Sequence, residues 1–303
     1  MKKISREELN EMLVQHELWL KNEGGKQLNL ENVDLRDFNL SHANLRCANL
    51  SNTDLRYADL RNADLNNANL RDADLRNANL NNVDLNDADL GYANLGSTNL
   101  GYANLGNANL RYANLEYAKL RSTNLRYANL EYAKLRSTNL RYANLEYADL
   151  NDANLEWANL NDANLRYANL RNADLRNANL KYANLEYVET SHLTIGYHLA
   201  CPEEGSFIGY KKANGCLVKL LILEDSKRSS ATSMKCRCDK AKVLDIIDLM
   251  TNEKIDRTKS DYDNEFFYKV GEIVQVEDFD EDRWNECTIG IHFFMNKENA
   301  IKY

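Results

Sequence analysis

Cysteine and histidine side chains can bind metals or act as nucleophiles and bases, so they are the first candidates for chemistry. Five of the six cysteines lie at 189–303, and with one histidine of that region they form the candidate set: Cys201, Cys216, Cys236, Cys238, Cys287 and His292. Structural zinc sites usually combine two C-x2–4-C or H-x3–5-H pairs. The C-x-C pair of Cys236 and Cys238 is tighter than that, and no second pair occurs. We therefore expect no metal and no cofactor, and we interpret the cysteines as buried, reduced thiols.

A cysteine nucleophile would need a histidine within reach. Cys287 and His292 are five residues apart, and on a strand such residues face opposite sides. No P-loop, G-x-G-x-x-G or G-x-S-x-G motif occurs either. The sequence therefore predicts a protein without catalytic residues, and we expect that it is not an enzyme.

A run of basic residues at 226–242 has a net charge of +5, and an acidic run at 277–286 has a net charge of −5. With the neighbouring serines, four of the basic residues form a candidate anion site: Lys227, Arg228, Lys235 and Arg237. Mutual neutralisation of the two runs inside one domain explains them without a ligand, and we favour that interpretation.

Leucine occupies every fifth position from Leu30 to Leu185, which makes 32 leucines. A small residue, usually alanine, lies two positions before most leucines, with Leu28 and Phe38 among the exceptions. Asn or Asp lies one position before each leucine, except at Lys119 and Lys134. On an α-helix this period would distribute the leucines around the surface, and on a straight strand it would send alternate leucines to opposite faces. The leucines share one interior only if the chain turns a corner in every unit. Four corners then close a coil of about 20 residues, stacked at the interstrand spacing of about 4.8 Å.

The pattern resembles the pentapeptide-repeat family, for example in RNADLNNANLRDADLRNANL at 61–80. The resemblance implies an all-β solenoid, the right-handed quadrilateral β-helix, here of about eight coils over 26–188. Its handedness comes from the resemblance and not from the spacing. The Asn or Asp of each unit is expected to bond the turn backbone locally.

Residues 20 positions apart should stack on the outside of this solenoid. Two aromatic ladders follow, which are the candidate interaction surface: Tyr127, Tyr147, Tyr167 and Tyr187, and Tyr92, Tyr112 and Tyr132. Alternating charges run beside them: Arg126, Glu146, Arg166 and Glu186 on one corner, and Glu116, Arg136, Glu156 and Arg176 on another. Such ladders hold coils in register, which is the interpretation we favour, and a tyrosine-rich face is also typical of interface cores.

Both ends of an open β-helix need a cover. At the N-terminus, 1–25, we expect a capping helix over 5–22, with a Ser5–Glu8 capping box, a Gly24-Gly25 stop and a packed rather than ligating His16.

After Val188 the period ends. Residues 189–303 predict an α+β domain with strands near 206–210, 216–223, 241–247, 266–270, 272–276 and 289–294 and a helix at about 296–302. This region resembles an uncharacterised domain found after pentapeptide repeats in bacterial and bacteriophage proteins, in the segments SMKCRCDKAKVLDI and DFDEDRWNECTIGIHFF. That resemblance implies no activity.

Three functions remain open. The favoured one is a non-enzymatic scaffold that binds another protein. The second is mimicry of DNA towards gyrase or topoisomerase IV, which some pentapeptide-repeat proteins practise, through the acidic coils at 31–90, whose net charge is −5. The third is a ligand-binding or enzymatic C-terminal domain displayed on the β-helix.

The overall charge of −8 makes nucleic acid an unfavoured partner. No apolar run or signal peptide predicts membrane insertion or export, so we expect a cytoplasmic protein. A monomer is favoured, and Phe38 and the tyrosine ladders leave a dimer open.

Overall fold

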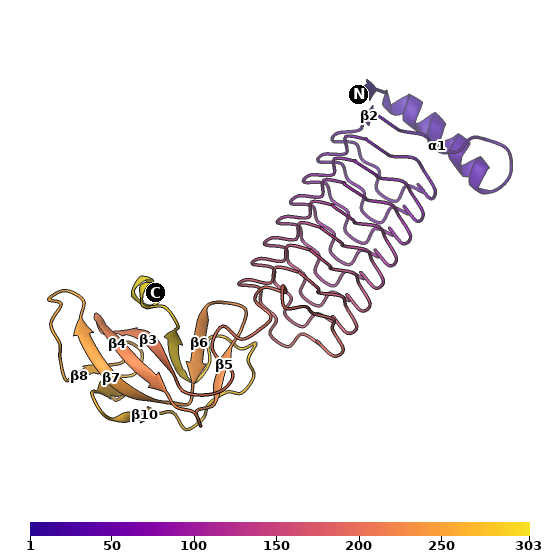
Figure 1. Cartoon of the computed structure of the whole chain (residues 1–303). Helices are drawn as coiled ribbons and strands as arrows, with labels where there is room; N and C mark the ends of the chain where they lie inside the picture. Colours follow the sequence, from indigo (N-terminus) through magenta and orange to yellow (C-terminus); the bar gives the residue numbers. More distant parts are fainter. The chain divides into compact units, whose positions relative to one another are not determined.

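The computed structural model describes residues 1–303 and divides into two compact units, Met1–Ile195 and Gly196–Tyr303. The first unit contains strand β1 (Lys2–Lys3), helix α1 (Arg6–Leu20), strand β2 (Val33–Asp34) and a long stack of coils (Figure 1). Neither helix of the structure has the length and apolar character needed to cross a membrane.

The coils are joined by parallel β-bridges between residues 20 positions apart, such as Asn29 with Asn49 and Asn109 with Asn129. The leucine N–H of each unit donates to a carbonyl in the next coil, as Leu30 does to Asn49 at 2.7 Å. Within each unit the N–H at the small-residue position donates to the preceding leucine carbonyl, which closes a turn, as Ala128 does to Leu125 at 3.0 Å. The predicted corner in every unit is confirmed, and this unit is a β-helix solenoid.

The leucines and the small residues line the interior of the solenoid, as predicted. Leucines from Leu30 to Leu180 are at most 2% exposed. Where threonine replaces alanine, its hydroxyl donates to a leucine carbonyl, as Thr123 does to Leu100 at 2.8 Å. These buried hydroxyls are therefore all satisfied by backbone carbonyls.

The second residue after each leucine adopts a left-handed conformation, with φ near +60° from Asn32 to Tyr187. The turn requires positive φ at this place, which Asn and Asp tolerate better than other non-glycine residues. Where Asn or Asp precedes the leucine, its side chain accepts the N–H of the residue that follows the leucine, as Asn129 does from Glu131 at 3.0 Å. The expected local bond between Asn or Asp and the turn backbone is thus confirmed.

Helix α1 packs on the N-terminal end of the solenoid (Figure 1). The predicted Ser5–Glu8 capping box is present at its start. His16 is fully buried, and its Nδ1 accepts the N–H of Leu28 at 3.0 Å, so it is a packed histidine as expected. At the turn back into the first coil, a Cβ on Gly25 would lie 2.1 Å from the carbonyl oxygen of Gln15, so only glycine fits there.

At the other end, residues beyond Val188 still pair with the last coils. Glu189 bridges Asn169, and Ile195 bridges Asp174. The hydrogen bonds of the solenoid therefore continue past the end of the five-residue period.

The second unit is built on a seven-stranded antiparallel sheet in the order β10-β7-β4-β3-β11-β6-β5. Its strands are β3 (Phe207–Ala213), β4 (Cys216–Ile222), β5 (Arg228–Ser230), β6 (Lys235–Cys238), β7 (Lys240–Asp248), β10 (Ile273–Gln275) and β11 (Ile291–Phe294). Strands β8 (Arg257–Lys259) and β9 (Phe267–Lys269) form a separate pair, and α2 (Lys297–Lys302) follows β11. All six predicted strands and the helix are present, whereas β5, β6 and β8 were not predicted.

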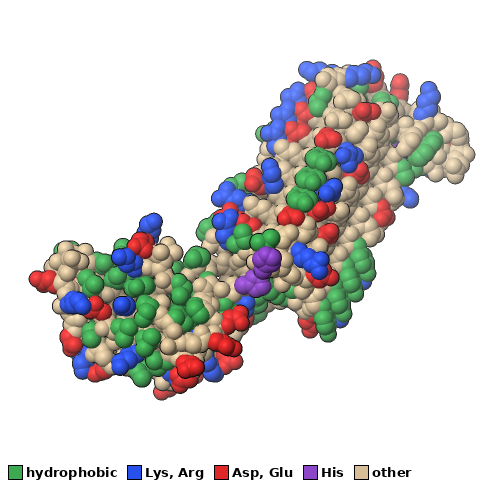
Figure 2. Space-filling model, viewed as in Figure 1, with side chains coloured by type: hydrophobic (Ala, Val, Ile, Leu, Met, Phe, Trp, Pro, Cys, Tyr) green, Lys and Arg blue, Asp and Glu red, His purple; other side chains and the backbone are tan.

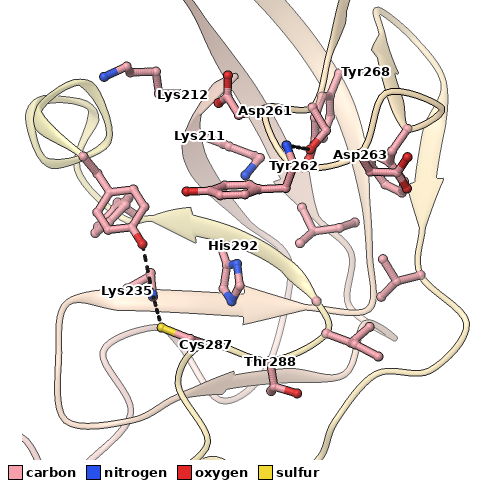
Figure 3. Close-up of a pocket in the computed structure, with 18 residues that line it drawn as sticks. Lys211, Lys212, Lys235, Asp261, Tyr262, Asp263, Tyr268, Cys287, Thr288 and His292 are labelled. Carbon is pink, nitrogen blue, oxygen red and sulfur yellow. Dashed lines mark hydrogen bonds between the residues drawn. The ribbon is translucent and has the colours of Figure 1, made fainter. Parts of the chain in front are cut away.

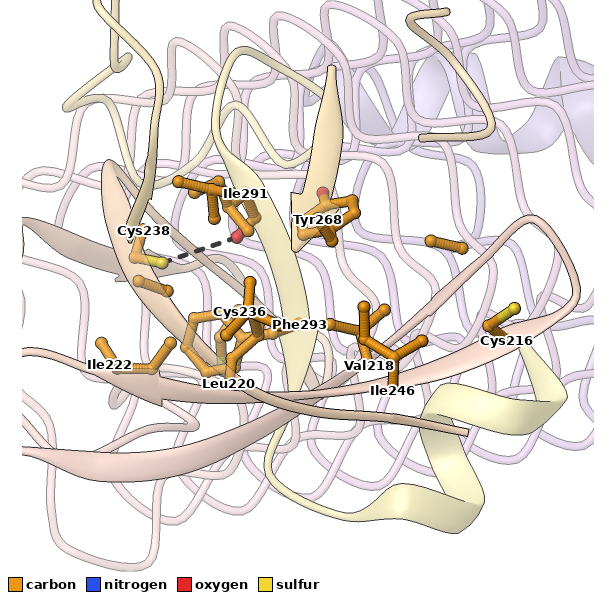
Figure 4. Close-up of a cluster of buried hydrophobic side chains, with 14 of the residues drawn as sticks. Cys216, Val218, Leu220, Ile222, Cys236, Cys238, Ile246, Tyr268, Ile291 and Phe293 are labelled. Carbon is orange, nitrogen blue, oxygen red and sulfur yellow. Dashed lines mark hydrogen bonds between the residues drawn. The ribbon is translucent and has the colours of Figure 1, made fainter. Parts of the chain in front are cut away.

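One face of this sheet carries the core of the unit, where Phe293, Val218 and Leu220 are fully buried (Figure 4). Cys236 and Cys238 belong to this core, and all six cysteines of the chain are free thiols. Burial, among other causes, raises the pKa of the Cys238 thiol, which keeps it protonated. A Cβ on Gly209 would lie 2.6 Å from the ring of Phe293, so β3 passes too close to this ring for any other residue.

Candidate functional site

The predicted tyrosine ladders form on the outside of the solenoid. We define the first ladder as Tyr127, Tyr147, Tyr167 and Tyr187 and the second ladder as Tyr92, Tyr112 and Tyr132. Successive rings in both ladders stack with centroids 4.8–5.0 Å apart and planes within 13° of each other. The stacking is therefore confirmed, and it follows directly from the 20-residue coil.

The two ladders occupy neighbouring corners, because Tyr127 and Tyr132 are five positions apart in one coil. Their rings remain accessible: Tyr147 is 41% and Tyr187 is 66% exposed. Figure 2 shows hydrophobic side chains gathered in columns along the solenoid, with charged side chains beside them. A band of exposed aromatic rings therefore runs along the coils.

Arginines of the neighbouring positions cover the ring faces. The Arg126 and Arg166 guanidinium carbons lie 4.7 and 4.5 Å from the centroids of Tyr127 and Tyr167, and each arginine donates to the hydroxyl of the same tyrosine. In the second ladder Arg111 lies 4.8 Å from the centroid of Tyr112. These contacts hold the arginines against the rings.

The predicted charge ladder beside the first tyrosine ladder is also present. Glu146 lies between Arg126 and Arg166, with ion-pair distances of 3.0 and 3.8 Å, and Arg166 reaches Glu186 at 3.4 Å. On the other predicted corner, Arg136 pairs with Glu156 at 3.4 Å. Because acids and bases alternate along both corners, the surface near the tyrosines has little net charge.

Several carboxylates of the acidic coils at 31–90 are paired with arginines, whereas Asp37, Asp72 and Asp87 form no ion pair. Arg36 donates to Asp34 and also lies 3.4 Å from Asp54, which itself accepts from Arg56. The hydrogen bond from Arg36 holds the pKa of Asp34 well below its usual range. Paired carboxylates give a weaker outward negative field than free ones, whereas mimicry of DNA needs a continuous field.

The four residues of the candidate anion site have separate partners. Lys227 pairs with Glu281, in the acidic run at 277–286. Arg228 donates to the carbonyls of Gly205, Leu223, Glu224 and Ser226. The buried Arg237 donates to the carbonyls of Asp280 and Asp282. Lys235 contacts the Tyr303 hydroxyl at 3.2 Å and the Cys287 sulfur at 3.4 Å.

Strand register explains this separation. Arg228 is paired with Cys238 and Ser229 with Arg237, so Arg228 and Arg237 face opposite sides of the sheet. Residues that are close in the sequence are thus divided between the two faces, and only Lys235 lines a cavity.

That cavity, of about 720 Å³, lies in the second unit, and the sequence did not predict it. It is lined by residues from β3, β6, β9 and β11 and from the loops before β9 and β11 (Figure 3). Cys287 precedes β11 rather than lying on it, and both Cys287 and His292 line the cavity, although no contact joins them. Burial and the charges of Lys235 and Lys211 lower the pKa of His292 to about 4.

Comparison with known proteins identifies relatives for both units. A family model described as pentapeptide repeats (8 copies) matches 27–62, 53–91, 88–126, 119–156 and 158–188, which together exceed half of the chain. A family of unknown function, DUF5758, matches 197–300. No curated protein matches the chain at a significant level.

Several solved structures are similar to the solenoid. The pentapeptide repeat protein HetL, involved in heterocyst differentiation regulation in the cyanobacterium Nostoc sp., is 30% identical over 58% of this chain and 92% of its own, with a TM-score of 0.22. Rfr23 from the cyanobacterium Cyanothece is 26% identical over 61% of this chain and 97% of its own, with a TM-score of 0.17. QnrB1, a plasmid-mediated fluoroquinolone resistance protein, is 19% identical over 54% of this chain and 82% of its own, with a TM-score of 0.32.

Proposed function

The chain belongs to the pentapeptide-repeat family, and from that premise we propose that it is a non-enzymatic cytoplasmic scaffold whose solenoid binds another protein through its tyrosine ladders. The observation that carries the proposal is the pair of stacked ladders on neighbouring corners, exposed to solvent and flanked by arginines. Tyrosine and arginine are the residues most enriched in the energetic centres of protein interfaces.

The stacking also lowers the entropic cost of binding. A ring such as Tyr147 is held between two others at 5.0 and 4.8 Å, so little of its side-chain freedom remains to be lost on association. The local ion pairs leave the face nearly neutral, so the partner surface we expect is apolar and aromatic with hydrogen-bond acceptors, rather than strongly charged.

Site-specific photo-crosslinking tests the proposal. A photoreactive phenylalanine derivative replaces Tyr147 in one protein and Tyr102 in another. Tyr102 is 58% exposed and occupies the same place in its turn, but it has no stacked ring. In native lysate we expect a discrete adduct from position 147, reduced by excess unlabelled protein, and no such adduct from position 102. Absence of an adduct, or the same adducts from both positions, would contradict the proposal.

Mimicry of DNA is the alternative for this solenoid, and the arginine pairing of Asp34 and Asp54 argues against it. A supercoiling assay with purified gyrase separates the two functions, because a DNA mimic must change gyrase activity at micromolar concentration. For the solenoid itself we infer a right-handed, four-sided coil, as the family resemblance implies. About eight coils follow from the 20-residue spacing of the bridges over 26–185.

A further inference from the structure

The cavity of the second unit opens where two strands of the sheet separate. Strands β3 and β11 share one residue pair, Tyr210 with Phe294, and the structure records no further pairing between them. In the antiparallel direction, the end of β3 at Lys211 and Lys212 faces the start of β11 at Ile291 and His292, and these residues line the cavity. The sheet thus leaves a gap with side chains on both of its borders.

Basic groups from three strands meet around this gap. Lys211 and Lys212 come from β3, Lys235 from β6 and His292 from β11. Figure 3 shows Lys211 and His292 directed into the cavity from their two strands. Lys235 is only 8% exposed, and its ammonium contacts a tyrosine hydroxyl and a thiol rather than a carboxylate.

Two of these basic groups have a nitrogen atom without a hydrogen-bond partner. The Lys211 ammonium forms no hydrogen bond or ion pair and lies 6.0 Å from the centroid of the Tyr268 ring. The buried Nε2 of His292 has no hydrogen-bond partner. Burial lowers the pKa of Lys211, and the charge of Asp261 offsets only part of that effect. Buried polar groups are normally satisfied, so these two require an explanation.

The acids of the cavity do not supply that partner. The Asp261 carboxylate accepts the N–H of Asn214 at 2.8 Å, and the Asp263 carboxylate accepts the N–H of Glu265 at 2.9 Å. Both carboxylates therefore fix loop backbone, although Asp261 lies near enough to Lys211 to favour its charged form. The lining itself carries three lysines and two acids, and the charge of Glu286 acts on Lys235 from beside the cavity.

The remaining lining is largely apolar and aromatic. Phe266, Tyr268, Val276, Ile289 and Phe294 contribute rings and aliphatic surface, and Tyr303 stands beside Lys235. A pocket of this size, with apolar walls and a few convergent polar groups, is the usual form of a small-molecule site.

We propose that this cavity binds a small organic anion, with its carboxylate or phosphate head between Lys211, Lys235 and His292 and its ring against the aromatic wall. The anion supplies a bonded acceptor for the Lys211 ammonium and another for His292 when the ring is protonated. This proposal is independent of the protein-binding role of the solenoid, since it rests on the second unit alone.

Titration calorimetry with the full chain tests the proposal, using phenyl phosphate, benzoate, inorganic phosphate and neutral phenol as probes. We expect phenyl phosphate or benzoate to bind more tightly than both inorganic phosphate and phenol, because only they supply both head and ring. The better of the two identifies the head group. Failure of both aromatic anions at millimolar concentration, or equal binding of phenol, would overturn the proposal.

Variants locate the binding. Lys211→Met keeps an unbranched side chain one atom shorter and removes the charge. It should weaken binding of the better anion by about tenfold or more, the effect of losing one charge-assisted hydrogen bond. Lys254→Met changes an exposed lysine outside the cavity and should leave the affinity unchanged. An unchanged affinity in Lys211→Met would refute the site.

A measurement on the unaltered protein covers the case in which Lys211→Met fails to fold. Bound anion should raise the pKa of His292, which the NMR signals of its ring report directly. Saturation with the anion without any change in the titration of His292 would exclude the proposed position of the head group.

Discussion

The stacked tyrosines should stabilise the solenoid by an amount that one substitution can measure. Tyr147 stacks on Tyr127 at 5.0 Å and on Tyr167 at 4.8 Å. An aromatic pair contributes about 0.5–1.5 kcal/mol beyond the area that it buries, so removal of both pairs should cost about 1–3 kcal/mol. Tyr147→Asn is the suitable change, because asparagine tolerates the left-handed conformation of this corner and occupies it in other coils.

The matched control is Tyr102→Asn. Tyr102 has the same backbone conformation, with φ of +59°, but its neighbours 20 residues away are Asn82 and Ser122, so it has no ring to stack on. Any effect of the Tyr-to-Asn change on the corner itself is common to both variants. The difference between them therefore isolates the stacking.

Urea unfolding followed by circular dichroism measures this difference. We expect Tyr147→Asn to lower the free energy of unfolding of the solenoid by about 1–3 kcal/mol more than Tyr102→Asn does. The excess should shrink when Tyr127 and Tyr167 are already asparagine, because the stacked pairs are then absent. Equal destabilisation by the two single variants would refute the argument that the rings stabilise each other.

Three further changes test the packing of the two units. Leu110→Ala, in the middle of the solenoid interior, should lower the free energy of unfolding in urea by about 2–5 kcal/mol. A smaller loss would mean that the coils close the space left by the removed leucine side chain. Gly209→Ala should destabilise the second unit by about 1–3 kcal/mol, because its Cβ would overlap the Phe293 ring. The loss should shrink when Phe293 is already leucine, and equal losses in the two backgrounds would contradict the steric argument. Because the pKa of His292 is lowered, the folded unit binds fewer protons than the unfolded chain between pH 6.5 and about 4. The contribution of His292 to the stability of the unit should therefore be complete above pH 6.5 and fall towards pH 4, by at most about 3 kcal/mol and by less with solvent screening. His292→Leu should reduce that fall. A pH dependence that is the same in His292→Leu would contradict this linkage.

The solenoid could be predicted from the sequence because its contacts are set by one short period. Once the coil is 20 residues long, the inward position of Leu130 and the stacking of Tyr127 on Tyr147 follow without any knowledge of distant segments. The positive φ at every corner was not predicted, although the frequent Asn and Asp at that position were a signal for it.

The second unit was predictable only where its strands have an apolar pattern. Strands β5, β6 and β8 are short and rich in basic and hydroxyl residues, and they are held by their neighbours in the sheet rather than by their own propensity. The cavity was missed for a related reason. Lys211, Lys235 and His292 are distant in the sequence and form no motif, and they meet only because β3 and β11 separate.

The left-handed corner also governs which mutations the solenoid can accept. All 32 corners from Asn32 to Tyr187 lack valine, isoleucine and threonine, whose branched Cβ strains this conformation. A single base change converts an asparagine codon into one for tyrosine, aspartate, histidine or serine, and each of these occurs at a corner. Any asparagine corner is therefore one base change from tyrosine. Genetic drift can lengthen or shorten a tyrosine ladder coil by coil, while the leucines and alanines of the interior stay the same.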